Sequence, residues 1–319
     1  MKRTKKTHSI TMIITVLVAA TTLLVAGCSM DGDGSTGIMN LSMTDAPLDA
    51  SGVNGVYITV EGIEYNLNGQ WETMSGFDGP QTFDLAALTG GDSELLGALQ
   101  LPAGDYTQIR FMLGVAEQED GTTPSNPGSW IEYGTNDTYD KDTDGDTALF
   151  VPSGGQTGYK AEAGEPFTVP ANGSVNITAD FDLRKAVVEA GASGLMILKP
   201  VLRLIVEDQA GSISGSVTNE GTNDVVVYAY EDGDYVAGEA DDPADGESRF
   251  PNAVTSARPD SDGNYTLAFL AAGTYDLVVA EYSDGEYVLD SAAEVAVAAD
   301  KDVSAGEATT EVDITITVD

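Results

Sequence analysis

The sequence has almost no histidine or cysteine, the residue types on which much nucleophilic and zinc chemistry depends. Its single histidine is His8 and its single cysteine is Cys28, so both lie near the N-terminus. A Ser-His-Asp triad needs a histidine, the usual zinc sites need histidine or cysteine, and a disulfide needs two cysteines. Beyond Cys28 the chain therefore cannot form a His-based triad, a cysteine nucleophile, a disulfide or a usual zinc site.

Basic residues are also scarce. The chain has 14 Lys and Arg against 52 Asp and Glu, and four of the basic residues lie within its first six positions. Without those four, 10 basic residues remain and the net charge is −42. A field of this sign repels nucleic acid and favours cations, so we expect no nucleic-acid partner. Residues 28–210 and 211–319 each carry −21, so the acidity is spread over the whole chain.

The N-terminal segment has the parts of a secretory signal peptide. MKRTKK is basic, an apolar run from Ile10 to Val25 follows, and small residues precede Cys28. The apolar run is shorter than the roughly 20 residues of a spanning helix, which argues against the alternative of a retained transmembrane segment. We therefore predict that residues 1–27 are a signal peptide and that the protein is exported.

The end of this segment, Val25-Ala26-Gly27-Cys28, resembles the lipobox of bacterial lipoproteins. That resemblance implies that Cys28 becomes the N-terminus and carries the lipid (palmitate) anchor that attaches the protein to the membrane. Residues 28–36 would then form a flexible tether. Ser29 follows the cysteine, which favours placement of the lipoprotein in the outer membrane if the cell has one.

Most of the chain reads as β-structure. Long amphipathic helical patterns are scarce, and short β-branched or aromatic runs between Gly, Asn, Asp and Pro predict an all-β protein. Asn68-Gly69 between two such runs predicts a tight hairpin. Short helices are expected at residues 85–88 with 93–99 and at 183–189. The expected strands include residues 56–60, 63–67, 70–73, 106–113, 175–183 and 199–206.

A domain boundary is expected at Ala210-Gly211, where a new series of short strands and turns begins. The pattern suits two β-sandwich domains, at residues 37–208 and 211–319. Both contain the sequence L-x-A-G-x-Y, at 101–106 and 270–275, where glycine permits a tight turn and tyrosine packs its ring inside. We interpret this repeated motif as a shared fold feature; the alternative is that it marks two ligand sites in tandem.

Eight short segments of the first domain, taken in order, match a known family. They are LSMTDAP (41–47), VYITV (56–60), FDLAAL (83–88), LPAG (101–104), YTQIR (106–110), VPS (151–153), DFD (180–182) and LKP (198–200). Over about residues 37–206 the chain thus resembles the bacterial and archaeal lipoprotein domains catalogued as domain of unknown function 4382. This resemblance implies no chemistry that can be carried over.

Four segments of the second domain match another group of domains. They are SGSV (214–217), VVVYAY (225–230), DGNYTL (262–267) and AGTY (272–275). Over about residues 211–319 the chain resembles the carboxypeptidase regulatory-like or Cna-B-like domains. The resemblance implies a prealbumin-like sandwich, which usually serves as a spacer or accessory module and is sometimes grouped with carbohydrate-binding-like folds.

The segment DKDTDGD (140–146) has the beginning of a calcium loop. Carboxylates alternate around Gly145 as in the first half of an EF-hand loop, and calcium takes six to eight oxygen ligands. The closing glutamate is replaced by Val151, and the flanks read as loop and strand. Two interpretations remain open: a partial calcium site that needs a further ligand from elsewhere in the fold, and a solvated acidic loop. The predicted ligands are Asp140, Asp142, Asp144 and Asp146.

Asp180 and Asp182 form a second pair of carboxylates, two positions apart on an expected strand. Residues i and i+2 share one face of a strand, so these carboxylates stand side by side. A glycosidase instead needs two carboxylates that flank the scissile bond. We expect the pair to face outward and to form ion pairs with Arg184, Lys185 or Lys199.

Two tryptophans are candidates for stacking against sugar rings. Trp71 follows a hairpin turn and is expected in the core, whereas Trp130 lies beside the acidic loop and is the predicted ligand-binding residue.

These features together predict a lipid-anchored cell-envelope protein that is not an enzyme and has a binding or structural role. Its partner would be a glycan or another surface protein, and calcium would support the acidic loop. The alternatives are a carboxylate-dependent hydrolase of envelope or extracellular polymers and a pure structural spacer.

Overall fold

The computed structural model describes residues 35–47, 52–114, 127–191, 194–219, 221–244, 246–283, 286–288 and 296–316. The predicted signal peptide, Cys28 and nearly all of the predicted tether lie outside these ranges. Residues 35–319 form one compact unit. Within the described ranges, no helix is long and apolar enough to cross a membrane.

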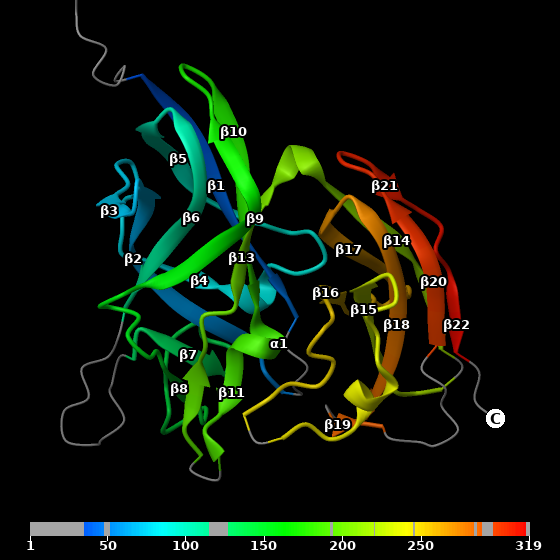
Figure 1. Cartoon of the computed structure of the whole chain (residues 1–319). Helices are drawn as coiled ribbons and strands as arrows, with labels where there is room; N and C mark the ends of the chain where they lie inside the picture. Colours follow the sequence, from blue (N-terminus) through cyan, green and yellow to red (C-terminus); the bar gives the residue numbers. More distant parts are fainter. Residues whose placement is uncertain are drawn as a thin grey trace, which may run out of the picture. The chain divides into compact units, whose positions relative to one another are not determined.

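The all-β prediction is confirmed, because strands dominate both halves of the chain (Figure 1). The first half forms one hydrogen-bonded sheet of thirteen strands, and its short helical pieces are η1 (Leu85–Ala87) and α1 (Leu183–Ala186). The strands are β1 (Thr36–Ala46), β2 (Gly55–Leu67), β3 (Gln70–Thr73), β4 (Gln81–Asp84), β5 (Glu94–Pro102), β6 (Gly104–Leu113), β7 (Ser129–Glu132), β8 (Thr147–Phe150), β9 (Tyr159–Val169), β10 (Ser174–Asp182), β11 (Val187–Glu189), β12 (Met196–Leu198) and β13 (Leu202–Val206).

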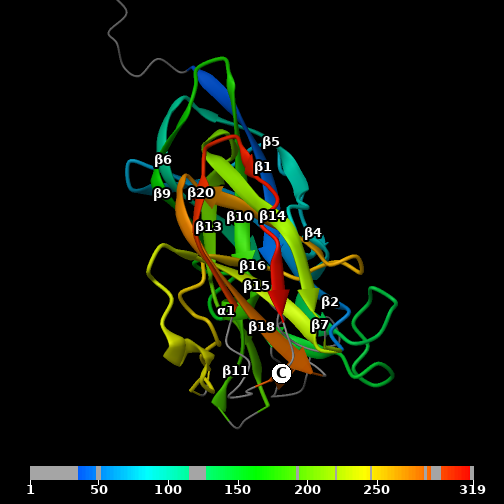
Figure 2. The ribbon, with the colours of Figure 1, turned by 90° about the vertical axis from the view of Figure 1, so that its right-hand side faces the viewer.

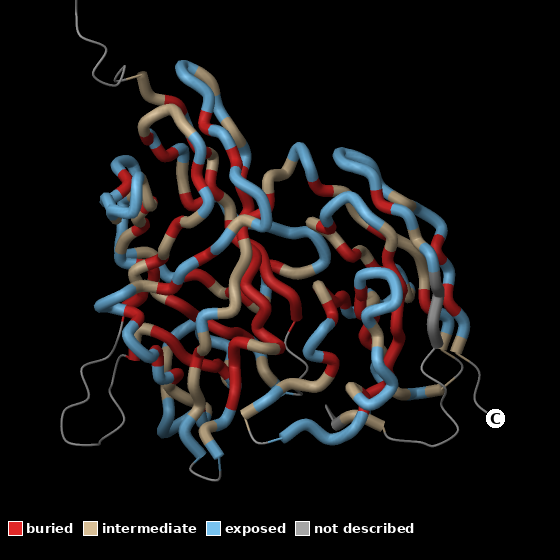
Figure 3. The backbone as a smooth tube through the Cα atoms, viewed as in Figure 1, coloured by how far each residue is buried: buried red, intermediate tan, exposed pale blue. Residues whose placement is uncertain are grey.

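The central strands of this sheet are neighbours in the order β2, β6, β9, β13, β10, β1 and β5. β1 pairs with β10 in parallel, with Ile38 opposite Ser174, and with β5 in antiparallel orientation. Figure 2 shows this group of strands from a second direction. Side chains on one face, such as Met43, Phe111 and Phe181, form a single hydrophobic core. Figure 3 marks the buried residues of the backbone in red.

The second half has two sheets with a hydrophobic core between them, which is a β-sandwich. Val217 and Leu267 of one sheet and Val227 and Val279 of the other contribute to that core. The change from the first half occurs at η3 (Glu207–Gln209). The other elements are β14 (Ala210–Asn219), β15 (Asp224–Glu231), η4 (Ala237–Ala240), β16 (Thr255–Ala257), β17 (Asn264–Ala271), β18 (Gly273–Ser283), β19 (Glu286–Tyr287), β20 (Ala296–Val303), β21 (Ala308–Thr309) and β22 (Ile314–Ile316).

A second hydrophobic cluster covers the other face of the five-stranded sheet. Tyr228 and Tyr282 of that sheet pack with Phe250 and Ala253, which belong to the long segment between β15 and β16. The sheet is therefore buried on both faces over its centre, and the segment that covers it also reaches the first half.

The predicted hairpin is confirmed. Asn68 (φ 53°) and Gly69 (φ 84°) form the two-residue turn between β2 and β3, and positive φ at both positions is what such a turn requires.

The helix expected at residues 93–99 is wrong, because this segment is strand β5. Leu95, Leu96 and Leu99 have helical spacing, but the segment instead pairs with β1 through a register shift near Gly97. The helix expected at 183–189 is shorter than predicted, since α1 ends at Ala186 and β11 follows.

The repeated motif L-x-A-G-x-Y has a structural explanation. The Tyr106 hydroxyl donates to the Pro102 carbonyl at 2.6 Å, and the Tyr275 hydroxyl donates to the Ala271 carbonyl at 2.9 Å. Both rings are buried, so each tyrosine ties the start of its strand to the residue four positions earlier, much as a tyrosine corner does. The interpretation as a shared fold feature accounts for both copies.

Candidate functional site

A row of polar side chains crosses the outer face of the thirteen-stranded sheet. Residues directly opposite each other on neighbouring strands share a face, and the register places charged residues opposite one another from β2 to β10. The opposed pairs include Glu64 with Arg110, Arg110 with Lys160, Glu162 with Arg203, and Arg203 with Asp180. We call this row the polar stripe; its members are Trp71, Glu64, Arg110, Lys160, Glu162, Arg203, Asp180 and Thr44.

One end of the polar stripe is buried. Asp180 is 4% exposed, and its Oδ2 accepts a hydrogen bond from Arg203 Nε at 2.9 Å and forms an ion pair with Arg203 Nη2, which lies 2.7 Å away. Burial raises the pKa of Asp180 above its usual value, although the Arg203 charge opposes this shift. The pair therefore neutralises a carboxylate that has lost its hydration.

Asp182 lies next to this end and holds two cations. Its carboxylate binds Arg184 through both oxygens, at 3.0 and 2.7 Å, and lies 3.1 Å from Lys185 Nζ. Both cations also donate to the Ala253 carbonyl in the second half, and Lys185 Nζ is 2.7 Å from that oxygen. The Arg184 guanidinium lies 5.5 Å from the centre of the Tyr228 ring. Asp182 thus fixes the cations that join the two halves.

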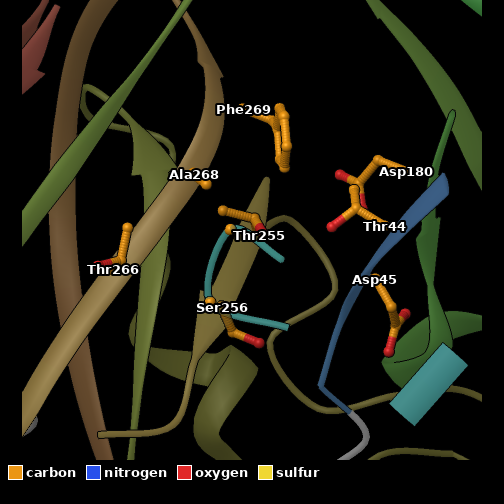
Figure 4. Close-up of a pocket in the computed structure, with 10 residues that line it drawn as sticks. Thr44, Asp45, Asp180, Thr255, Ser256, Thr266, Ala268 and Phe269 are labelled. Atoms are coloured by element: carbon orange, nitrogen blue, oxygen red, sulfur yellow. The ribbon is translucent and has the colours of Figure 1, made fainter. Parts of the chain in front are cut away.

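A small cavity of about 10 Å³ lies where the halves meet (Figure 4). Thr44, Asp45 and Asp180 line it from the first half, and Thr255 and Ser256 line it from the second. This volume holds about one water molecule and no larger ligand.

Asp45 is the most strongly perturbed acid in this region. Its Oδ1 accepts the Leu183 N–H at 3.0 Å, whereas its Oδ2 is buried without a hydrogen-bond partner among the described residues. Burial raises the pKa of Asp45 well above its usual value, and the Asp180 and Asp182 carboxylates raise it further.

The expectation for Asp180 and Asp182 was partly wrong. Both lie on the face opposite the core, as the alternation predicted, but they are 4% and 7% exposed rather than open to solvent. The second half covers them, and Asp180 pairs with Arg203, which lies 23 residues further along the chain. Ion pairing of Asp182 with Arg184 and Lys185 agrees with the prediction.

The other end of the polar stripe is open. Trp71 is half-buried, and the Arg110 guanidinium lies 4.5 Å from the centre of its ring. Arg110 is held by Glu64, with 2.7 Å between Nε and Oε2, and it donates to the Thr157 carbonyl at 3.1 Å. Lys160 Nζ lies 5.8 Å from the same ring centre. The expectation that Trp71 belongs to the core is wrong, because the hairpin places it beside these cations.

Trp130, the predicted ligand-binding residue, does not present its ring to solvent. It is 7% exposed and stacks on Tyr57, with ring centres 4.7 Å apart and an interplanar angle of 11°. Tyr139 contacts it edge-on. In this structure Trp130 packs beneath the acidic loop, so the exposure on which its prediction rested is absent.

Residues 140–146 form a tight loop held by its own carboxylates. Asp146 is buried, and its two oxygens accept N–H groups of Tyr133 (2.8 Å) and Asp140 (2.9 Å). Asp140 Oδ1 accepts N–H groups of Asp142 and Thr143, and these bonds lower the pKa of Asp140. Asp144 accepts the Asn136 side-chain amide at 2.6 Å. Within the described ranges, no three acidic side chains are grouped as a metal site would require.

The fold and these sites define an all-β protein with a buried ionic junction between its halves. Residues 36–200 match the family described as domain of unknown function (DUF4382). This match covers more than half of the chain, which therefore belongs to that family. Among curated proteins, none matches the chain.

Several solved structures are remotely similar to the chain. A leucine-rich repeat protein from Bacteroides thetaiotaomicron is 14% identical, with 89% of this chain and 26% of that chain covered, at a TM-score of 0.22. The minor pilin of Streptococcus agalactiae is 12% identical (88% and 97% covered, TM-score 0.20). The shaft pilin SpaA of Lactobacillus rhamnosus GG is 11% identical (88% and 99% covered, TM-score 0.21). The chain spans about a quarter of the length of the first protein, and TM-scores near 0.2 carry no argument about function.

Proposed function

We propose that this protein is a lipid-anchored, non-catalytic binding protein of the cell envelope. The observation that carries the non-catalytic part is the state of Asp180 and Asp182, the carboxylates that a hydrolase would use. Both are neutralised by arginine and buried at the junction of the two halves, where the cavity holds about one water molecule. A polymer substrate has no room there, so their role is structural.

The anchoring part rests on the sequence. The basic start, the apolar run and the lipobox-like ending at Cys28 support export and lipidation. Lipid attachment at Cys28, followed by a short tether, would hold the compact unit of residues 35–319 close to the membrane surface.

We predict binding to polysaccharide without hydrolysis. Full-length protein in detergent should sediment with one or more of insoluble cellulose, chitin and mannan, and reducing ends should not appear in the supernatant. Release of reducing ends that is lost in D180N would establish the hydrolase instead, and failure to bind any polymer would favour the spacer.

Mass spectrometry of the N-terminal peptide should show acyl chains on Cys28 that the C28S variant lacks.

Calcium support of the acidic loop is a separate proposal. Asp142 is exposed and the half-buried Asp144 carboxylate accepts the Asn136 side-chain amide, whereas Asp140 and Asp146 hold the backbone of the loop. A bound ion would thus add to a turn that is already formed, which suits the weak affinity of extracellular calcium modules.

At 5 mM calcium and a Kd of about 1 mM, binding should stabilise the fold by about 1 kcal/mol. Urea unfolding of the full-length chain with calcium or with a chelator measures this difference. D142N should abolish it, and magnesium at the same concentration is the ionic control. Equal unfolding midpoints with calcium and with chelator would remove calcium from the proposal.

A further inference from the structure

The open end of the polar stripe borders a hollow of about 620 Å³, a volume within the range of small-molecule sites. The hollow lies where β13 leaves β9, because these strands pair only at Arg203 and Leu204. Lys160 lines the hollow, and its Nζ lies 5.8 Å from the centre of the Trp71 ring, so this lysine connects the tryptophan to the edge of the hollow. The lining residues are Thr157, Gly158, Lys160, Glu162, Pro200, Leu202 and Arg203.

Arg110, Arg203 and Glu162 are held in place at this surface before any ligand arrives. Arg110 is fixed by Glu64, by the Thr157 carbonyl and by the Trp71 ring, and Arg203 is fixed by Asp180. Glu162 accepts the side-chain amide of Gln108 at 2.7 Å. Groups fixed in this way lose little conformational entropy on binding.

The charges of this surface balance. Arg110, Lys160 and Arg203 face Glu64, Glu162 and Asp180, three of each sign, in a chain whose net charge is −38 over all residues. The field of the whole molecule opposes the approach of an anion, and the local balance gives no net attraction for one. An uncharged ligand that needs both hydrogen-bond donors and acceptors fits this surface better.

We propose that Trp71 and the adjoining hollow bind a neutral oligosaccharide segment. The apolar C–H face of a pyranose ring would pack on the part of the Trp71 indole that Arg110 leaves uncovered, and its hydroxyls would bond to Lys160, Glu162 and Arg203, which supply donors and acceptors. This inference rests on the proposed binding function and assigns its ligand class and its surface.

Tryptophan fluorescence tests the proposal directly, because the chain has two tryptophans and Trp130 is buried. In full-length W130F the emission comes from Trp71 alone. Titration with cellohexaose, maltohexaose, xylohexaose and mannohexaose should give a saturable change with at least one of them. Calorimetry with wild-type protein and that sugar supplies the reference affinity.

W71A should weaken this binding by about tenfold or more, the loss typical of an aromatic anchor, and K160A should weaken it severalfold. K301A, a lysine of β20 in the second half, is the matched control and should bind as wild type. A melting curve for each variant establishes that it is folded.

Three outcomes would overturn the proposal. If W71A and K160A bind as wild type, the surface is wrong although the binding function stands. If hexagalacturonate binds more tightly than the neutral sugars, the ligand class is wrong. If none of the four neutral hexasaccharides binds, the proposal fails as a whole, whereas hydrolysis of a polymer would refute the proposed function itself.

Discussion

Replacement of Asp182 by alanine is expected to lower the free energy of unfolding by about 3–5 kcal/mol, because it leaves buried cations without their counter-ion. The Arg184 side chain is 2% exposed and the Lys185 side chain 24% exposed, and burial lowers the pKa of Lys185. In D182A, Arg184 and Lys185 would still donate to the Ala253 carbonyl, but a carbonyl dipole does not replace the negative charge of a carboxylate. Urea unfolding of the full-length protein at neutral pH measures the loss.

The chain provides a matched control for this ion pair. Asp242 binds Arg249 at 2.8 Å, but the Asp242 side chain is 91% exposed, so D242A should change stability by no more than about 1 kcal/mol. The double variant D182L/R184M removes both charges and should recover part of the stability lost in D182A. Equal losses in D182A and D242A would show that the junction is not held by this pair.

Replacement of Asp45 by asparagine is expected to stabilise the protein at neutral and alkaline pH, by about 1–3 kcal/mol. Asparagine keeps an oxygen that can accept the Leu183 N–H, and it carries no charge in a site where the pKa of Asp45 is raised. Because the folded protein holds this proton more tightly than the unfolded chain, the native carboxyl favours folding at low pH. That contribution is lost as the pH rises through the pKa of the folded state.

The increase in unfolding free energy from D45N should therefore shrink as the pH falls toward the pKa of an aspartate in the unfolded chain, about 4. Unfolding free energies of wild type and D45N at pH 4.5 and pH 8 test this difference. The same pair of measurements on D242N, at a carboxylate whose side chain is 91% exposed, is the control. A gain from D45N that is the same at both pH values would contradict a raised pKa for Asp45.

Local patterns predicted much of the fold. Short β-branched and aromatic runs predicted strands within β2, β6 and β10, and Asn68-Gly69 predicted the hairpin between β2 and β3. The motif order in the first half also indicated the family to which residues 36–200 belong. These features depend on neighbours within a few residues, so they are visible without tertiary structure.

The errors occurred where distant residues decide the outcome. The leucines of β5 have helical spacing, but pairing with β1 overrides that preference. Whether a tryptophan is exposed depended on what covers it: Tyr57 and Tyr139 enclose Trp130, while the hairpin leaves Trp71 beside Arg110. The sequence around Asp180 contains no pattern that predicts its coverage by residues near Thr255.

The parallel pairing of β1 with β10 also limits the order in which this protein can fold. Asn40 and Asn176 bond across the pair although 136 residues separate them, so the loop to be closed is long and its entropy opposes early pairing. β1 can complete its ladder only after residue 182 is available, when more than half of the chain has been made. Contacts of such high sequence separation slow folding, and the first described strand stays open to other partners in the interval. If the chain is exported as proposed, it would gain from reaching the far side of the membrane unfolded, and from pairing this first described strand only there.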